Sequence, residues 1–168
     1  SVLRCSVVSN LSVQNLTKTF STATGHLEIL NGVGLEMSKG DSVSVTGPSG
    51  CGKSTLLYIL GLLDSPTSGS YELLGENVSD LSKDRQADIR NKEIGFIFQE
   101  HHLLPQCTVL ENVLIPTIPA SLDPQDKKER AENLLNKVGL HERFNHRPGQ
   151  LSGGARQRVA VCRSLINA

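Results

Sequence analysis

The sequence predicts an α/β protein in which an antiparallel β subdomain comes first and a helical subdomain is inserted around residues 100–150. Three observations lead to this prediction. Two strand-like segments, 12–20 and 27–37, are separated by a turn-rich stretch, a glycine-rich loop at 47–55 lies between a strand-like and a helix-like segment, and several helix start signals follow. The chain has 168 residues, 38% of them hydrophobic, so it is long enough to bury one core of ordinary size.

The N-terminal part contains three expected strands and one expected helix. Ser12 to Phe20 and Leu27 to Met37 are predicted to be strands joined by a turn, which makes a β-hairpin or meander. Asp41 to Thr46 alternates between polar and apolar residues and is predicted to be a strand that leads into the glycine-rich loop. Ser54 to Leu60 is then predicted to be a largely buried helix that stops near Gly61.

Two more strands and a polar helix are expected in the middle of the chain. A turn after the first helix is expected to lead into a strand from Ser70 to Leu74. Ser82 to Asn91 has the composition of an exposed helix. The run Ile94 to Phe98 is predicted to be a buried strand that ends at Gln99.

Two helices with clear end signals follow. Thr108 and Glu111 have the spacing of a capping box, and Pro116 is expected to close the short helix that they open. Asp123–Pro124 is expected to start a charged amphipathic helix that runs to Val138.

The glycine-rich loop satisfies the phosphate-binding pattern G-x-x-x-x-G-K-[ST] at every fixed position. Glycines let consecutive backbone N–H groups point inward, and the N-terminus of the following helix adds partial positive charge beneath a phosphate. The residues that we expect to bind a nucleoside triphosphate are therefore Gly47, Pro48, Ser49, Gly50, Cys51, Gly52, Lys53, Ser54 and Thr55.

Three side chains of this loop have expected roles. Lys53 reaches the β- and γ-phosphates, Ser54 offers its hydroxyl to Mg²⁺, and Thr55 lies on the α-phosphate side. The competing interpretation is a glycine-rich turn that only joins two elements. Such a turn explains the glycines but not a lysine followed by two hydroxyl residues, so the nucleotide site is the stronger interpretation.

A second glycine pair precedes another expected helix, in the segment Leu151, Ser152, Gly153, Gly154, Ala155, Arg156, Gln157. Ser152 is a good N-cap, and the helix N-terminus behind it exposes backbone N–H groups suited to an anion. On its own, this segment is explained by a cap and a flexible joint. Its position in the sequence indicates more than a cap, because it lies about a hundred residues after the phosphate loop and about fifty after Gln99.

Together, the three motifs resemble the ATP-binding cassette family over about residues 12–168. The resemblance implies that 47–55 is the Walker A loop, and that Gln99 senses Mg²⁺ or the attacking water. It implies further that a signature acts on the ATP held by the opposite subunit, so that two copies sandwich two nucleotides head to tail. The signature residues are Leu151, Ser152, Gly153, Gly154 and Gln157.

Two positions add detail to the resemblance. Phe20, about thirty residues before Lys53, matches the position whose aromatic ring stacks on adenine in that family. The alternative is that Phe20 belongs to the core of its strand. Ala155 departs from the family, which usually carries Glu or Gln there, and this change is expected to weaken a local hydrogen bond.

Three shorter pieces, 60–69, 100–105 and 145–148, resemble the bacterial branch that includes lipoprotein-release, macrolide-export and cell-division ATPases. The resemblance implies an ATPase that drives transmembrane permease subunits for lipoprotein release or export. It would work as a homodimer, peripheral on the cytoplasmic face of the bacterial inner membrane. No apolar stretch approaches the roughly 18 residues of a membrane span, so membrane association would depend on the permease.

The family continues, beyond the point where this sequence stops, into an apolar strand ending in Asp-Glu and a switch histidine. We therefore expect residues 11–168 to be a partial nucleotide-binding domain, lacking the C-terminal strands, behind a poorly ordered leader at 1–10. We identify no general base in the chain, so the 168-residue chain is expected to bind ATP without hydrolysing it. Missing strands should leave unpaired strand edges and exposed apolar surface.

Charge and cysteine content argue against other classes. Lys plus Arg and Asp plus Glu both number 17, so no basic field indicates nucleic acid. The four cysteines are spread without a C-x-x-C pattern, which disfavours a zinc site. Two rival interpretations stay open, namely a soluble cassette ATPase that acts outside transport and a nucleotide-binding module that does not hydrolyse.

Overall fold

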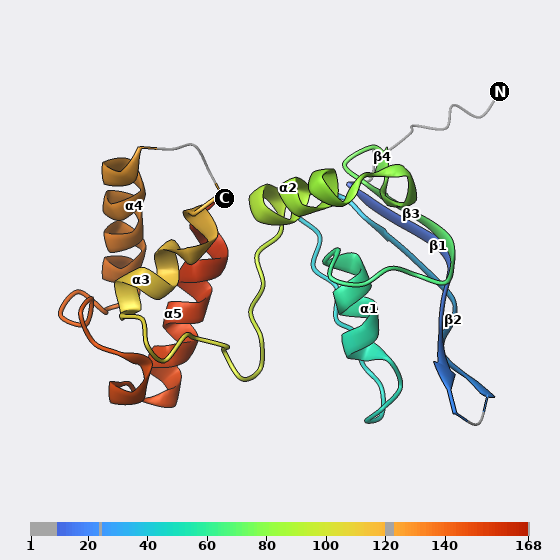
Figure 1. Cartoon of the computed structure of the whole chain (residues 1–168), viewed down its shortest axis with the longest axis horizontal. Coiled ribbons are helices and arrows are strands. Elements are labelled where there is room, and N and C mark those ends of the chain that lie inside the picture. Colours follow the sequence, from blue (N-terminus) through green and yellow to red (C-terminus); the bar gives the residue numbers. More distant parts are fainter. Residues whose placement is uncertain (1–9, 24, 120–122, 168) are drawn as a thin grey trace. The chain divides into compact units, whose positions relative to one another are not determined.

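The structure is a computed structural model that describes residues 10–23, 25–119 and 123–167. Residues up to Ala87 and residues from Asp88 onward form two compact units, which we describe separately. Figure 1 shows that strands and one helix dominate the first unit and that helices dominate the second. Of the leader expected at 1–10, only Asn10 falls within the described residues, so that expectation stays a prediction.

The first unit contains a four-stranded antiparallel sheet in the order β2-β1-β3-β4. β1 Leu11–Thr22 and β2 Gly25–Met37 form the hairpin that the two strand-like segments and the turn between them predict. β3 Ser68–Leu73 pairs with β1 on its other side, and the short β4 Glu76–Asn77 pairs with β3. The antiparallel strands expected before the phosphate loop and after the first helix are therefore confirmed.

The core of the first unit lies between this sheet and α1 Lys53–Leu60. Leu56 and Ile59 of α1 are buried, and the helix ends at Gly61 as predicted. Tyr71 of β3 is buried and donates its hydroxyl to the backbone oxygen of Leu60 at 2.7 Å. Burial raises the pKa of Tyr71, so the hydroxyl stays protonated and keeps donating. The C-terminal end of α1 is thereby tied to the sheet.

A 3₁₀ turn, η1 Val78–Asp80, and the polar helix α2 Lys83–Glu93 follow the sheet. The side-chain amide of Gln86 donates to the backbone oxygens of Val78 and Leu81, which ties the start of α2 to η1. The boundary between the two units falls within α2. The helix expected over 82–91 is confirmed.

The second unit consists of helices around one apolar cluster. They are α3 Val109–Leu114, η2 Ile115–Thr117, α4 Pro124–Lys137, η3 Pro148–Gln150 and α5 Gly153–Leu165. Buried members of the cluster come from α3, α4 and α5 and include Val109, Val113, Ala131, Leu135, Val159 and Cys162. The shared core extends beyond the expected helical range of 100–150, because α5 contributes to it as fully as the other two helices.

The predicted helix start signals of this unit are confirmed. Thr108 and Glu111 form a reciprocal capping box, with Thr108 N donating to Glu111 Oε2 at 2.7 Å and Glu111 N donating to Thr108 Oγ1 at 3.2 Å. Asp123 caps α4, and Ser152 caps α5. Each cap satisfies a backbone N–H that has no partner inside its helix.

Two of the expected strands are wrong. Asp41–Thr46 and Ile94–Phe98 have irregular backbone, and neither pairs with a strand in the described part of the chain. Val43 is 49% exposed and Ile97 is 53% exposed, so these apolar side chains are not buried either. A strand is stabilised by hydrogen bonds to a neighbouring strand, so an alternating or apolar pattern without a neighbour does not create one.

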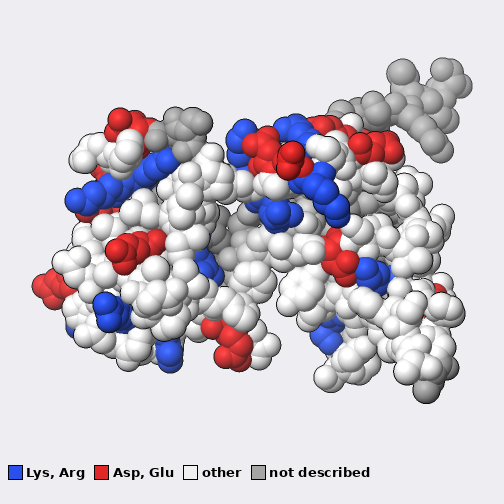
Figure 2. All heavy atoms as spheres, in the orientation of Figure 1, with Lys and Arg blue, Asp and Glu red and all other residues white. Residues whose placement is uncertain are grey.

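The surface carries mixed charge. Figure 2 shows Lys and Arg interspersed with Asp and Glu on the face in view. None of the described helices combines the length and the apolar character needed to cross a bilayer. Among residues 10–23, 25–119 and 123–167, no three His, Cys, Asp or Glu side chains gather in a way that could hold a metal ion.

Candidate functional site

The phosphate loop, residues 47–55, leads directly into α1, and Gly52 is the N-cap of that helix. Gly52 has a left-handed φ of 91°, a conformation that side chains disfavour. A β-carbon at this position would also lie 2.9 Å from the backbone oxygen of Ile29 and 2.9 Å from Leu30 Cδ2, both on β2. Glycine is therefore required here by backbone conformation and by the close approach of the loop to the sheet.

Lys53 closes the loop on itself. Its Nζ donates to the backbone oxygen of Gly47 at 2.9 Å and to that of Pro48 at 2.6 Å. An ammonium group has three N–H donors, so two of them hold the start of the loop near the start of α1. The third faces Cys51 Sγ at 3.7 Å, a weak acceptor that a phosphate oxygen can replace.

The N-terminus of α1 is not capped by a side chain in the described structure, and its first turn holds no acidic residue. The first backbone N–H groups of a helix have no partner within the helix and need another acceptor. A phosphate held in the loop would be that acceptor, and the positive end of the helix dipole would favour it. Ser54 is exposed and Thr55 half-buried on this first turn, so the Ser54 hydroxyl can be reached by a ligand or metal ion.

Phe20 lies near the end of β1, where it pairs with Leu27 of β2. Its side chain is 41% exposed, which does not fit a residue of the strand core. Lys18 Nζ lies 4.9 Å from the ring centroid, a cation–π contact that steadies the ring. The exposed ring is available for stacking on a base, and that role stays a prediction.

Gln99 stands in a turn of the second unit that we call the Gln99 turn, residues 98–102. His101 N donates to the backbone oxygen of Phe98 at 3.0 Å, and His102 N donates to that of Glu100 at 2.7 Å. The Gln99 side chain is exposed and borders a groove of about 360 Å³. The other residues that line this groove are Glu100, His101, Leu103, Pro105, Pro148, Gly149 and Arg156.

The signature segment, residues 151–157, forms the start of α5. Ser152 Oγ accepts from Ala155 N at 3.3 Å, so the predicted N-cap is present. Leu151 is half-buried, whereas Ser152, Gly153, Gly154 and Gln157 are exposed and leave the helix N-terminus accessible. Ala155 is 7% exposed and has no side-chain acceptor, so the reciprocal half of a capping box, from the Ser152 N–H to residue 155, cannot form.

The predicted site residues fall into two sets. Phe20 and the phosphate loop belong to the first unit, and Gln99 and the signature segment belong to the second. Within the second unit, Gln99 and Arg156 of the signature segment border the same groove. The structure therefore brings the glutamine and the signature segment together.

Asn112 of α3 was not identified from the sequence. It is fully buried, its Oδ1 accepts from Leu104 N at 2.7 Å, and its Nδ2 donates to the backbone oxygens of Leu104 at 3.1 Å and Thr108 at 2.9 Å. The side chain thus holds the segment that follows the Gln99 turn. A lone Asn inside an apolar helix pattern is the signal that could have pointed to it.

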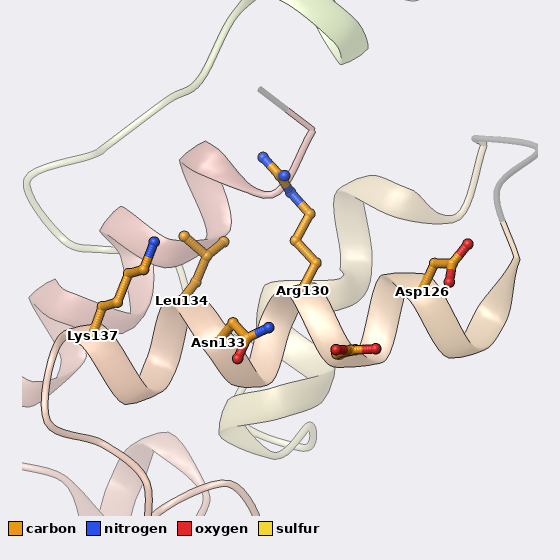
Figure 3. A pocket seen from close by; sticks show the side chains of 6 residues that line it. Asp126, Arg130, Asn133, Leu134 and Lys137 are labelled. Atoms are coloured by element: carbon orange, nitrogen blue, oxygen red, sulfur yellow. The ribbon is translucent and has the colours of Figure 1, made fainter.

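A hollow of about 390 Å³ runs along α4 (Figure 3). Its lining residues, Asp126, Glu129, Arg130, Asn133, Leu134 and Lys137, all come from this one helix. Arg130 extends from α4 to the end of α5, where its Nε donates to the backbone oxygen of Ile166 at 2.7 Å. Side chains of one helix do not converge on a ligand from several sides, so we assign no ligand to this hollow.

The sequence profile of the family described as "ABC transporter" matches residues 30–168. The lipoprotein-releasing system ATP-binding protein LolD of Legionella pneumophila (strain Lens) is 46% identical over 157 residues, which cover 94% of this chain and 69% of that protein. The macrolide export ATP-binding/permease protein MacB of Vibrio parahaemolyticus is 45% identical over 157 residues, which cover 94% of this chain and 24% of that protein.

Solved structures of the ABC transporter cassette MJ0796 match as well. The dimeric structure has a TM-score of 0.84 and 42% sequence identity, and the match covers 94% of this chain and 69% of that one. A second dimeric structure, of the post-hydrolysis state bound to ADP and Pi, has the same TM-score and identity.

Proposed function

Because this chain belongs to the ABC transporter family, we propose that it is part of the ATP-binding subunit of a transporter complex, and that this subunit binds and hydrolyses ATP to drive a membrane permease. The observation that supports this proposal most directly is the phosphate loop. Lys53 closes the loop by donating to the backbone oxygens of Gly47 and Pro48, and the N-terminus of α1 has no side-chain cap. Both features suit a bound triphosphate.

The nine residues of the phosphate loop, Gly47 to Thr55, would hold the phosphates, and Phe20 would stack on the adenine ring. Ser54 and Gln99 would hold Mg²⁺. Their hydroxyl and amide oxygens are the hard donors that Mg²⁺ accepts, and both side chains are exposed. When bound, the metal neutralises charge on the transferred phosphoryl group.

The signature residues Leu151, Ser152, Gly153, Gly154 and Gln157 would act on the nucleotide of a second copy of the chain. This assignment is supported by the exposed N-terminus of α5 and by the dimeric form of the matching cassette. A homodimer would then enclose two nucleotides, each between the phosphate loop of one subunit and the signature segment of the other.

The cargo is proposed from the relatives. LolD proteins from several bacteria are 46–49% identical to this chain, and their name assigns them to lipoprotein release. We infer that the permease partner releases or exports lipoproteins. The ATP-binding subunit would lie on the cytoplasmic face of the bacterial inner membrane, held there by its permease.

Lys53→Ala tests the proposal. The variant loses a charge-assisted contact to phosphate, worth about 1.5–3 kcal/mol, so ATP affinity measured by calorimetry should fall by about 10–150-fold. Lys39→Ala is the matched control, because Lys39 is an exposed lysine in the same unit and should leave the affinity unchanged. Undiminished ATP binding by Lys53→Ala would refute the proposed nucleotide site.

A further inference from the structure

The second half of α5 contacts the chain on both sides of Gln99. Arg163 Nη2 donates to the backbone oxygen of His101 at 2.6 Å, and Nη1 donates to that of His102 at 2.7 Å. Before the turn, Gly95 lies so close to α5 that an added β-carbon would overlap the backbone oxygen of Ser164. The segment 95–102 thus lies against α5 four residues before Gln99 and is hydrogen-bonded to α5 two to three residues after it.

The Gln99 turn is strained. His101 and His102 are consecutive non-glycine residues with left-handed φ values of 61° and 44°. The His101 Nδ1 atom is buried without a hydrogen-bond partner in the described structure. Such features persist only where surrounding contacts hold them.

Ring contacts stabilise the interior of the turn. Phe96 stacks on Phe98 at a centroid distance of 5.5 Å, and Phe98 meets His102 edge-on at 4.9 Å. These contacts stay within the segment. The fork of Arg163 instead joins the segment to another element, and it does so through two parallel hydrogen bonds that a guanidinium is shaped to donate.

α5 begins at the signature segment. The helix that carries Ser152 at its N-cap therefore carries Arg163 three turns later, and a continuous helix transmits displacement along its axis. We propose that Arg163 is a positioning residue for Gln99, which couples the Gln99 turn to the signature helix so that the two move as one body. The coupling itself is a property of the second unit. Its consequence for ATP hydrolysis rests on the proposed ATPase function.

Hydrogen–deuterium exchange of the purified protein tests the coupling without nucleotide. Arg163→Met removes the donors to the His101 and His102 carbonyl oxygens, so the turn should open more often and the amides that donate within it, to Phe98 and Glu100, should lose protection. The peptide covering 96–104 should then exchange about tenfold faster. Arg163→Lys keeps the charge but cannot donate in a fixed fork, so its exchange should fall between those of the wild type and Arg163→Met. If Arg163→Met does not fold, the exchange of Arg163→Lys still tests the proposal.

Arg130→Met is the matched control. Arg130 is also a guanidinium that donates to two consecutive backbone oxygens, those of Leu165 and Ile166, but these two hydrogen bonds tie α4 to the end of α5 and not to the Gln99 turn. It should leave the exchange of 96–104 unchanged. Equal acceleration in Arg130→Met, or no acceleration in Arg163→Met, would overturn the proposal.

The kinetic consequence is tested in the assembled transporter. Arg163→Lys should lower kcat for ATP hydrolysis and leave the affinity for ATP unchanged, because the phosphate loop belongs to the other unit. A rise in KM with unchanged kcat would contradict a positioning role. This outcome is separate from the Lys53→Ala result, which tests whether ATP is bound at the phosphate loop at all.

Discussion

α1 and α5 both begin after glycine-rich sequence, but their N-termini differ. α1 is preceded by Gly52, which has no side chain and leaves the first turn uncapped. α5 is preceded by Ser152, whose hydroxyl accepts from Ala155 N. The start of α1 therefore has no side-chain acceptor for its backbone N–H groups, and a ligand can supply one. The start of α5 already has such an acceptor.

This difference indicates that the two helix starts have different roles in binding a phosphate. A phosphate that completes the N-terminus of α1 gains several backbone hydrogen bonds, so α1 is suited to primary binding. The capped start of α5 has fewer unpaired N–H groups and is suited to a weaker, secondary contact with a phosphate that is already bound. The comparison therefore predicts binding in one subunit first and capping by a second copy afterwards.

The largest expected effect concerns that second contact. Ser152→Arg places a bulky side chain where the γ-phosphate of the partner's ATP would lie, so ATP-dependent dimerisation should be lost while ATP binding by the single subunit persists. Light scattering with and without ATP measures this. Ser152→Ala removes the hydroxyl without adding bulk, so its ATP-dependent dimerisation should be weakened but not lost. An ATP-dependent dimer of Ser152→Arg would contradict the assigned role of α5.

The next effect concerns the uncapped helix. Gly52→Ala combines a left-handed φ with contacts at 2.9 Å to Ile29 and Leu30, so unfolding free energy should fall by about 2–4 kcal/mol and ATP binding should weaken. Gly50→Ala is the control, since Gly50 has a φ of 82° but open space around it. It should show only the backbone strain, about 1 kcal/mol. Urea unfolding compares the two, and an equal effect would show that the approach to β2 is unimportant.

A smaller effect is expected at the capped helix. Ser152→Ala loses the hydrogen bond to Ala155 N and should destabilise the protein by about 1 kcal/mol. Because residue 155 is Ala, no reciprocal bond remains to hold the helix start. Unfolding of Ser152→Ala by urea measures the loss, and a stability equal to that of the wild type would mean that the cap contributes nothing.

The smallest effect is a pH dependence in the first unit. Lys18 Nζ donates to Asp64 Oδ1 at 2.7 Å, and this hydrogen bond lowers the pKa of Asp64 below its ordinary value of 3.8. A lowered folded-state pKa gives stability that is present above pH 3.8 and is lost as pH falls through the folded value. The Asp64 side chain is 35% exposed, so the contribution should be below about 1 kcal/mol.

Lys18→Met tests this pair by urea unfolding at pH 7 and pH 3. The variant should be slightly less stable at pH 7 and should lose less stability on acidification than the wild type. Lys92→Met is the control, because Lys92 pairs with Asp88 on an exposed helix face. The same acid loss in Lys18→Met and in the wild type would show that the pair does not contribute.

Local signals account for what could be predicted from the sequence. The phosphate loop, the capping box at Thr108 and the N-cap at Ser152 depend on residues within a few positions of one another, and each was predictable. The predicted strands at 41–46 and 94–98 failed because a strand depends on a neighbour that an alternating or apolar pattern does not reveal. The hydrogen bonds from Arg163 to the backbone oxygens of His101 and His102 join residues about sixty positions apart, and no spacing in the sequence indicates them.

ATP should bind first at the uncapped start of α1. An amide NMR titration of the single subunit with Mg²⁺ and ATP reports both helix starts at once. The largest shifts should occur at residues 47–55, and Ser152 to Ala155 should change little until the subunit dimerises. Early, large shifts at Ser152 to Ala155 with an unchanged phosphate loop would show that α5, and not α1, binds the nucleotide first.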